Sequence, residues 1–321
     1  MTTHFNIRRG MLLVSILAIS SLVTAQTADR GLDRHNFFYA GEAKIHDMYK
    51  VENGAVTWHY HNPDSRGEIS DAILLTDGNI LFAHQFGITE ITADQRIVWN
   101  MDAPEGTEIH TVQPIGREHI VYLQNGLPAK MIVMHIPTKS IVREVELKTG
   151  TDNVHAHFRS GRLTPSGTYI VAHMDMDKVI EYDSRGNTVW SLDITSPWSV
   201  QPSDNGHFLI VSNGGFVREV NRFKETVWEM NIRGNPAYGI TSPQVAYRLP
   251  NGNTIVNNWF NEWDADVDRT NPPLQAIEVT PDKQVVWRLC SWSDPDLGPS
   301  TIIQPLSAPV DRDNLHFGDI K

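Results

Sequence analysis

The sequence predicts an all-β fold, a six-bladed β-propeller in which each blade contains four strands. Three observations support this prediction. A segment of about 40 residues recurs along the chain, each copy has a hairpin turn between apolar strands, and no stretch has a convincing helical period. A chain of 321 residues can form one closed all-β domain. Its 22 glycines and 18 prolines are spread along the sequence, which is typical of many short turns.

Tryptophan marks the end of the repeat. It closes a short polar turn and strand in five copies, at residues 49–58, 90–99, 181–190, 219–228 and 278–287. Trp99 and Trp190 are separated by two periods, and the copy between them, residues 135–143, has lost the Trp. This even spacing indicates repeated blades rather than separate domains.

Each unit opens with two apolar strands joined by a tight turn. Asp77-Gly78 and Asn251-Gly252 lie between alternating apolar runs, and such dipeptides are strong hairpin signals. Residues 162–171 and 201–211 match this pattern. The repeat therefore predicts an inner hairpin in each blade.

The units count to six blades, with seven as the alternative. Five full units begin near Ile69, Ile109, Phe158, Trp198 and Pro243. Residues 37–58 supply the last three strands of the sixth blade, and residues 301–306 supply its first strand. Pairing of the N- and C-terminal segments would remove the free sheet edges that invite aggregation.

The sequence divides into four segments. Residues 1–25 have the features of a signal peptide, because Arg8 and Arg9 precede a short apolar run and small residues follow it. We expect residues 26–35 to form an N-terminal extension, 36–309 the propeller and 310–321 a C-terminal tail. The apolar run is short for a membrane span. We therefore expect an exported protein, periplasmic or secreted, with no membrane span after signal cleavage; an uncleaved anchor is the alternative.

Charge and cysteine content limit the partners. The formal net charge is −11, and the predicted signal peptide contains two arginines and no acidic residue, so the exported chain is more acidic still. Such a surface disfavours nucleic acid as a partner. Cys290 is the only cysteine, which excludes an intramolecular disulfide and a Cys-based metal site.

The turn-then-Trp ending, as in residues 90–99 (EITADQRIVW), resembles the repeat of the quinoprotein-like (PQQ-repeat-like) β-propeller superfamily. In that superfamily the Trp docks one blade against the next. The resemblance spans about residues 36–306 and five of six blades, and it implies the fold more than the function. The superfamily includes quinone-cofactor dehydrogenases, outer-membrane assembly scaffolds and sulfotransferases that use an axial His.

This chain departs from each of those groups. The dehydrogenases carry an adjacent Cys pair in their cofactor site, which one cysteine cannot supply, so we expect no PQQ and leave other cofactors unassigned. The scaffold lipoproteins need an anchor Cys, which is missing here. The catalytic residues of the sulfotransferases cannot be matched position by position.

Polar and aromatic residues recur where a site would form. In a four-stranded blade, the start of the innermost strand and the end of the second strand lie on the same face. We predict catalytic residues His173, His110, His84 and Arg159, and substrate-binding residues Gln124, Trp198, Asn213, Gln244, Asn258 and Trp259. His155 and His157 lie in a loop on the same side. The alternative is a propeller axis filled by hydrogen-bonded polar residues and water.

These residue types fit an acidic saccharide. Neutral His can act as a base, nucleophile or metal ligand near neutral pH, and Arg159 can hold a carboxylate or sulfate. Trp faces suit sugar rings, and amide side chains read hydroxyl groups. A His acting with an Arg would suit β-elimination next to a uronate. Two other functions stay open: a non-catalytic exported scaffold that binds a protein partner, and a sulfotransferase-like enzyme with a His nucleophile.

A divalent metal is a further possible ligand. His84, His110 and His173 come from adjacent blades and could converge on an ion. An insertion at residues 260–275 alternates acidic residues, Glu262, Asp264, Asp266 and Asp268, beside Trp263 and Arg269. It lacks the Gly and the distal Glu of an EF-hand. It is interpreted either as a solvated acidic loop or as a lid over the site.

Overall fold

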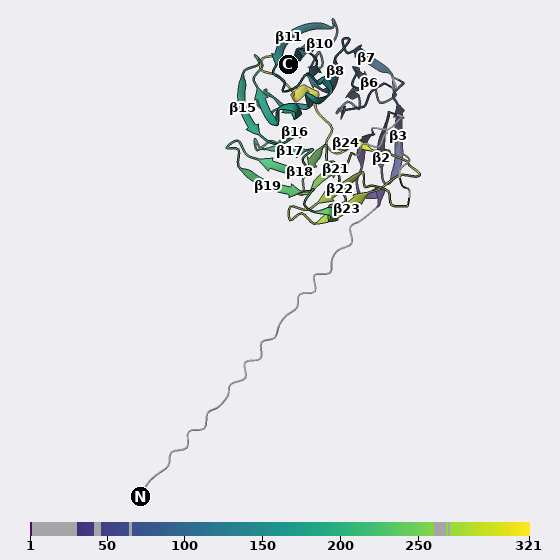
Figure 1. Ribbon diagram of the computed structural model, residues 1–321. Coiled ribbons are helices and arrows are strands. Elements are labelled where there is room, and N and C mark those ends of the chain that lie inside the picture. Colours follow the sequence, from purple (N-terminus) through teal and green to yellow (C-terminus); the bar gives the residue numbers. More distant parts are fainter. Residues whose placement is uncertain (2–30, 42–45, 64–65, 260–267, 269) are drawn as a thin grey trace.

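The computed structural model describes residues 1, 31–41, 46–63, 66–259, 268 and 270–321. It confirms the six-bladed propeller: six four-stranded antiparallel sheets form a ring (Figure 1). None of the described helices is long and apolar enough to cross a membrane.

We number the blades in chain order after the blade that closes the ring, and we name the strands of each blade from the innermost to the outermost. Blade 1 contains β4 (Asp71–Leu74), β5 (Ile80–Ala83), β6 (Gly87–Ile91) and β7 (Ile97–Asp102), and blade 2 contains β8 (Glu108–Ile115), β9 (His119–Asn125), β10 (Ala129–His135) and β11 (Ser140–Leu147). Blade 3 contains β12 (Phe158–Leu163), β13 (Tyr169–His173), β14 (Lys178–Tyr182) and β15 (Thr188–Asp193), and blade 4 contains β16 (Pro197–Pro202), β17 (Phe208–Ser212), β18 (Phe216–Val220) and β19 (Thr226–Asn231). Blade 5 contains β20 (Ala246–Arg248), β21 (Thr254–Asn257), β22 (Ala276–Val279) and β23 (Val285–Leu289). The described residues also form five short 3-10 helices. Three lie between strands, η2 (Val154–Ala156), η3 (Met174–Met176) and η4 (Pro236–Tyr238), while η1 (Leu32–Arg34) precedes the first strand and η5 (Arg312–Asn314) follows the last.

The sixth blade closes the ring with both ends of the propeller. Its order is β24 (Ser300–Pro305), β1 (Phe37–Gly41), β2 (Asp47–Glu52) and β3 (Ala55–His61). Strand β24 pairs antiparallel with β1, with Phe38 opposite Gln304. The predicted closure is confirmed, with strand bounds that differ from the predicted ones by no more than a few residues.

The core lies between neighbouring blades. One cluster joins Leu123 and Met131 of blade 2 to Tyr169 and Val171 of blade 3, all of them buried. Inner strands such as β5 are buried on both faces, whereas the outermost strand β7 alternates exposed and half-buried residues. This gradient explains why the inner strands read as apolar runs in the sequence and the last strand does not.

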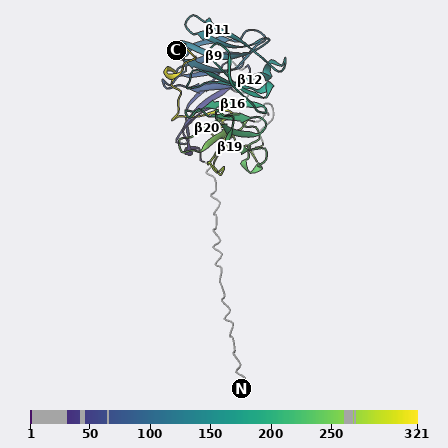
Figure 2. The same ribbon diagram turned by 90° about the vertical axis from the view of Figure 1, so that its left-hand side faces the viewer.

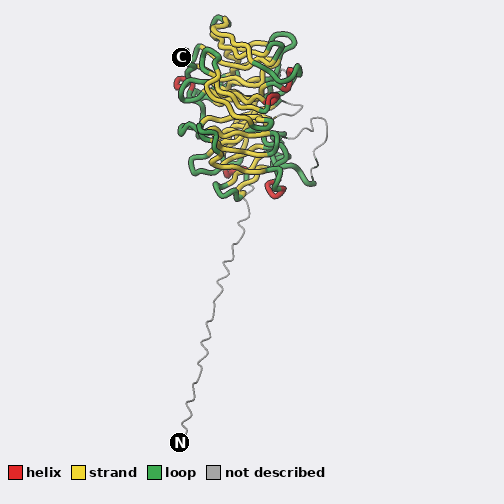
Figure 3. The backbone as a smooth tube through the Cα atoms, turned by 60° about the vertical axis from the view of Figure 1, so that its left-hand side comes forward, coloured by secondary structure: helices red, strands yellow, loops and turns green. Residues whose placement is uncertain are grey.

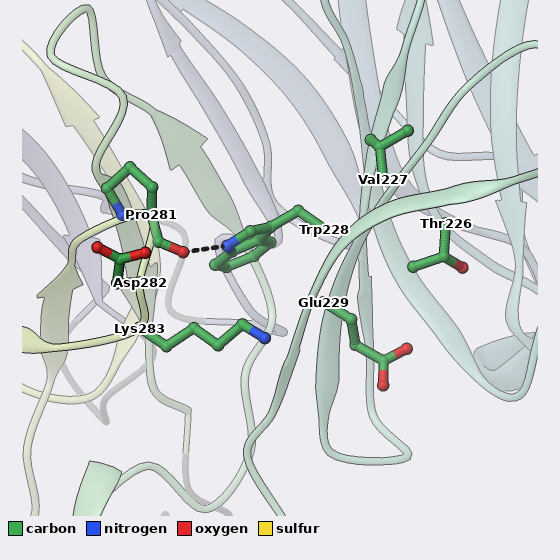
Figure 4. Close-up of a pocket in the computed structure, with 7 residues that line it drawn as sticks. All are labelled: Thr226, Val227, Trp228, Glu229, Pro281, Asp282 and Lys283. Carbon is green, nitrogen blue, oxygen red and sulfur yellow. Dashed lines mark hydrogen bonds between the residues drawn. The ribbon is translucent and has the colours of Figure 1, made fainter.

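In three blades the repeated Trp donates a hydrogen bond to the next blade. Trp228 Nε1 on β19 donates a hydrogen bond to the carbonyl of Pro281, in the turn between the last two strands of blade 5, at 2.8 Å (Figure 4). Trp58 and Trp190 make the same bond to equivalent turns, at Ala93 and Arg222. Trp99 differs, because its Nε1 donates to Glu90 of its own blade. At these three positions the motif therefore ties the outermost strand of one blade to a turn of the next.

The last twelve residues, predicted as a tail, pack on one face of the ring. Val310 pairs with Leu75 in blade 1, Gly116 N in blade 2 donates to Arg312 O at 3.1 Å, and Gly318 N donates to Gly167 O in blade 3 at 2.8 Å. These partners lie at the inner-hairpin ends of three consecutive blades. The side views place the C-terminus at one face of the disc (Figures 2 and 3). The opposite face carries the predicted site.

Candidate functional site

A β-bulge recurs near the start of the innermost strand. In blade 2, Ile109 pairs with Gln124 and Thr111 with Leu123, so His110 is the extra residue. The same irregularity in blades 3, 4 and 6 makes Arg159, Trp198 and Thr301 the extra residues. A bulge redirects the side chain of the inserted residue and is common next to functional sites. These bulges bring side chains from several blades together.

His110 is the centre of this group. Its side chain is fully buried, and both of its ring nitrogens face carboxylates. Nε2 lies 2.8 Å from Glu108 Oε2, and Nδ1 lies 3.0 Å from Glu68 Oε1. The hydroxyl of Ser70 lies 2.8 Å from the same Nδ1. A His with a partner at each nitrogen has a fixed ring orientation.

Glu108 links His110 to a second histidine. Its Oε2 lies 2.8 Å from His155 Nδ1, and its Oε1 accepts a hydrogen bond from Gln85 Nε2 at 3.0 Å. Burial raises the pKa of Glu108, but the hydrogen bonds from His110, His155 and Gln85 together hold it well below its usual range. The side chain of His155 is 46% exposed. Glu108 is therefore ionised and positioned between one buried and one accessible imidazole.

Arg159 connects this group to a pair of tryptophans. Its Nη1 donates to Glu68 Oε1 at 2.8 Å, and its Cζ lies 4.8 Å from the ring centroid of Trp198. Trp198 stacks in turn on Trp259, with centroids 6.2 Å apart and ring planes at 26°. Among the described residues, neither Arg159 Nε nor Trp259 Nε1 has a hydrogen-bond partner, although both atoms are buried. We call the following eight residues the axial site: Glu68, Ser70, Glu108, His110, His155, Arg159, Trp198 and Trp259.

A buried ion pair fills the axis below this site. Arg162 donates to both carboxylate oxygens of Asp71 at 2.8 Å, and Thr111 also donates to Asp71. Burial disfavours the charge of Arg162, but the Asp71 carboxylate raises the pKa of Arg162 above its usual range. The pair joins the innermost strands of blades 1, 2 and 3. It gives the axial site a closed polar floor.

Two of the predicted catalytic histidines lie away from His110. His173 is fully buried, its Nε2 lies 2.9 Å from the hydroxyl of Tyr182, and its ring packs edge-on against Phe158. Burial lowers its pKa to about 3. The ring of His84 packs on Phe82, and its Nε2 lies 3.3 Å from Thr89 of the same blade. The structure therefore does not bring His84, His110 and His173 together as a metal triad.

The predicted amide residues mostly hold loops. Asn258 Oδ1 accepts from the backbone of Thr241 and Ser242, each at 2.9 Å, and Asn213 Oδ1 accepts from the Ser242 hydroxyl at 3.0 Å. Gln244 is buried at the entry to blade 5, and its Nε2 has no partner among the described residues. Gln124 is buried opposite Ile109 in the β8–β9 ladder. Of the predicted substrate-binding residues, Trp198 and Trp259 belong to the axial site.

Sequence reasoning missed the two carboxylates. Glu68 and Glu108 each stand two residues before a predicted strand-start residue, in Glu-Ile-Ser at 68–70 and Glu-Ile-His at 108–110. The same spacing in consecutive repeats is a signal that could have identified them. The predicted lid residues Glu262, Trp263, Asp264, Asp266 and Arg269 lie outside the described residues. Asp268 is described, and its carboxylate accepts hydrogen bonds from Thr270.

Comparison with known proteins supports the class of fold. No family model matches the chain, and no curated protein matches it. Among solved structures, a protein of unknown function from Bacteroides caccae is 22% identical, with a TM-score of 0.71 over 84% of this chain and 98% of that one. A streptogramin B lyase structure is 11% identical, with a TM-score of 0.57 over 85% of this chain and 88% of that one.

A further match is a catalytically inactive virginiamycin B lyase from Staphylococcus aureus with quinupristin. It is 11% identical, with a TM-score of 0.56 over 82% of this chain and 87% of that one. At these identities the likeness concerns the fold. The protein is a six-bladed β-propeller.

Proposed function

We propose that the protein is an exported propeller of the quinoprotein-like superfamily that binds an acidic saccharide at the axial site. The observation that carries this proposal is the Arg159–Trp198–Trp259 stack beside His110. Export, periplasmic or secreted, follows from the features of residues 1–25 and is tested by sequencing the N-terminus of the protein recovered outside the cytoplasm.

The stack offers both kinds of contact that a uronate needs. The two indole rings provide apolar surface for a sugar ring, as aromatic faces do in many binding sites. Two buried donors, Trp259 Nε1 and Arg159 Nε, have no partner among the described residues. A buried donor without a partner costs free energy. A ligand hydroxyl or carboxylate that accepts from these groups would remove that cost and gain affinity.

Binding is tested by isothermal titration of the purified protein with an oligouronate and with a neutral oligosaccharide of equal length. We expect Trp198→Ala to weaken oligouronate binding by at least about tenfold, since a stacked sugar ring loses its aromatic platform. The matched control is Trp228→Phe, a tryptophan on the outer strand of the same blade. Equal affinity in Trp198→Ala and the wild type would contradict the proposal.

A catalytic role is favoured by the pairing of Glu108 with His155. When the Glu108 carboxylate accepts the Nδ1 proton of His155, Nε2 is left as a proton acceptor, and this side chain is half exposed. In β-elimination, His155 would take the proton on the carbon next to the uronate carboxylate. Those C–H electrons form the new double bond, the bond to the glycosidic oxygen breaks, and that oxygen takes a proton from solvent water.

The product of elimination is an unsaturated uronate, whose double bond is conjugated with the carboxylate and absorbs at short ultraviolet wavelengths. We expect absorbance to grow with oligouronate and His155→Gln to abolish the growth while binding is retained. If the protein binds oligouronate but forms no unsaturated product, it is a saccharide-binding protein and not a lyase. Binding of no saccharide would overturn the proposal and favour the scaffold function, for which a protein partner would be sought.

A further inference from the structure

We propose that Glu108, His110 and His155 form a site for one divalent cation that prefers mixed nitrogen and oxygen ligands, such as Zn²⁺. This inference does not depend on the saccharide. Three potential ligand atoms, one from each residue, lie within 4.8 Å of one another. Glu108 Oε2 is 2.8 Å from both His110 Nε2 and His155 Nδ1.

The ligand types match the cation. Two imidazoles and one carboxylate are a ligand set that catalytic zinc sites use, and three protein ligands leave coordination positions for water or substrate. The carboxylate and the two ring nitrogens now share protons at hydrogen-bond distance. A divalent ion would replace those protons and lie between the same three atoms.

An independent feature of the site is the partner on the far side of His110. Histidines that bind metals almost always donate their other ring nitrogen to a carboxylate or carbonyl, which fixes the ring and makes the ligand more basic. His110 Nδ1 lies 3.0 Å from Glu68 Oε1 and 2.8 Å from Ser70 Oγ. Gln85 holds the second oxygen of Glu108 in the same way, at 3.0 Å. Each of these two ligands therefore has an orienting group already in place.

The site is also reachable. Glu108 lines a surface hollow together with Arg66, Phe86 and Val154. His155 follows Val154 in η2 and is half exposed. The third ligand, His110, is fully buried. A cation can therefore enter from solvent and reach a rigid, buried ligand, as in sites that keep open coordination positions.

Charge gives a reason for a cation at this place. Within the axial site the carboxylates Glu68 and Glu108 outnumber the single arginine, Arg159. A divalent ion between these carboxylates would balance the excess of negative charge. In that state His155 is a ligand, and it no longer serves as the base of the elimination described above.

The test is titration of the EDTA-treated purified protein with Zn²⁺, followed by Co²⁺ and its visible absorption. We expect one equivalent to bind, with an intense Co²⁺ spectrum typical of a low coordination number. His155→Ala should weaken Zn²⁺ binding by more than about 100-fold. Glu68→Gln should weaken it by about 10–100-fold, the range found when an orienting partner is removed.

The control uses a second His and Asp group on the surface of blade 6. His59 Nε2 and His61 Nδ1 lie 3.2 and 2.9 Å from the two oxygens of Asp47. We expect His61→Ala to bind Zn²⁺ as the wild type does. Loss of the bound equivalent in His61→Ala, or its retention in His155→Ala, would overturn the proposal, as would no Zn²⁺ binding by the wild type.

Two further measurements separate this proposal from the saccharide proposal. Circular dichroism of metal-free His155→Ala checks that the variant is folded, which we expect because the replaced side chain is half exposed. Trp198→Ala should keep its Zn²⁺ affinity and lose oligouronate affinity. If the protein binds Zn²⁺ but no saccharide, only the metal proposal stands. If it binds saccharide but no Zn²⁺, only the saccharide proposal stands.

Discussion

Replacing His173 with glutamine should make the protein less sensitive to acid. His173 is fully buried between Phe158 and Tyr182, and its burial lowers the pKa to about 3 from an ordinary value of 6.5. Glutamine has no proton to gain in this pH range. Its amide can occupy the position of Nε2 and keep a hydrogen bond to the Tyr182 hydroxyl. The variant therefore removes the titration while keeping most of the packing.

The sign and size follow from proton linkage. Because the folded-state pKa is depressed, the unfolded chain binds a proton at His173 that the folded chain does not. The stability contributed by neutral His173 is therefore full above about pH 6.5 and falls as the pH falls toward 3. Each pH unit below 6.5 lowers the free energy of unfolding by about 1.4 kcal/mol, so a fall of two pH units lowers it by about 3 kcal/mol.

The assay is reversible denaturant unfolding of wild type and His173→Gln at about pH 7 and about pH 4.5. Buried carboxylates such as Glu278, whose pKa is lowered to about 2, destabilise both proteins in acid and cancel in the comparison. We expect the wild type to lose about 3 kcal/mol more than the variant between the two pH values. Equal losses would show that His173 becomes protonated in the folded state, and would refute the reasoning.

Three other predictions concern the axis, the blade contacts and the tail. Arg162→Met should destabilise the protein by about 3–5 kcal/mol in denaturant unfolding, because it leaves the Asp71 carboxylate buried and unpaired, and adding Asp71→Leu should restore much of the loss. Trp228→Phe should lower stability by about 1 kcal/mol, measured as a lower melting temperature, because one hydrogen bond to the next blade is lost. Removing residues 310–321 should cost at least about 3 kcal/mol, since Phe317 is fully buried, yet leave Zn²⁺ affinity unchanged. A large change in Zn²⁺ affinity would contradict the placement of the tail on the opposite face.

The fold could be predicted because the repeat encodes contacts between neighbouring blades. Trp58, Trp190 and Trp228 each bond to the same turn of the next blade, so one spacing recurs wherever that contact is made. Trp99, Trp287 and the copy that lost its Trp are the exceptions, since Trp99 bonds to Glu90 of its own blade and Trp287 bonds to the carbonyl of Gly31. The period of about 40 residues nevertheless predicted six blades, with seven as the alternative.

The site was only partly predictable because side-chain direction at a strand end depends on local backbone geometry. At the start of the innermost strand, bulges at His110, Arg159 and Trp198 redirect these side chains to contacts across blades. Alignment of the repeats placed these residues correctly. At the end of the second strand no such bulge occurs, and His84 and His173 contact residues of their own blades. Residue type at an equivalent position did not determine where the side chain would point.

Repeated structural contacts lie near the inner-hairpin face of the ring, and the candidate site lies on the opposite face. This difference explains why the repeat predicted the fold better than the site. The glutamates of the repeat, such as Glu90 and Glu219, are paired with arginines near the inner-hairpin face, Arg312 and Arg248. Glu181 and Glu278, at the same position of two other blades, pair with Arg222 and Arg34. A site needs different residues from different blades, so its members break the repeat rather than follow it. Glu108 is an example. Its position two residues before the predicted strand start is shared only with Glu68 of the preceding unit, and its proposed role as a ligand depends on His110 and His155, which the fold places beside it.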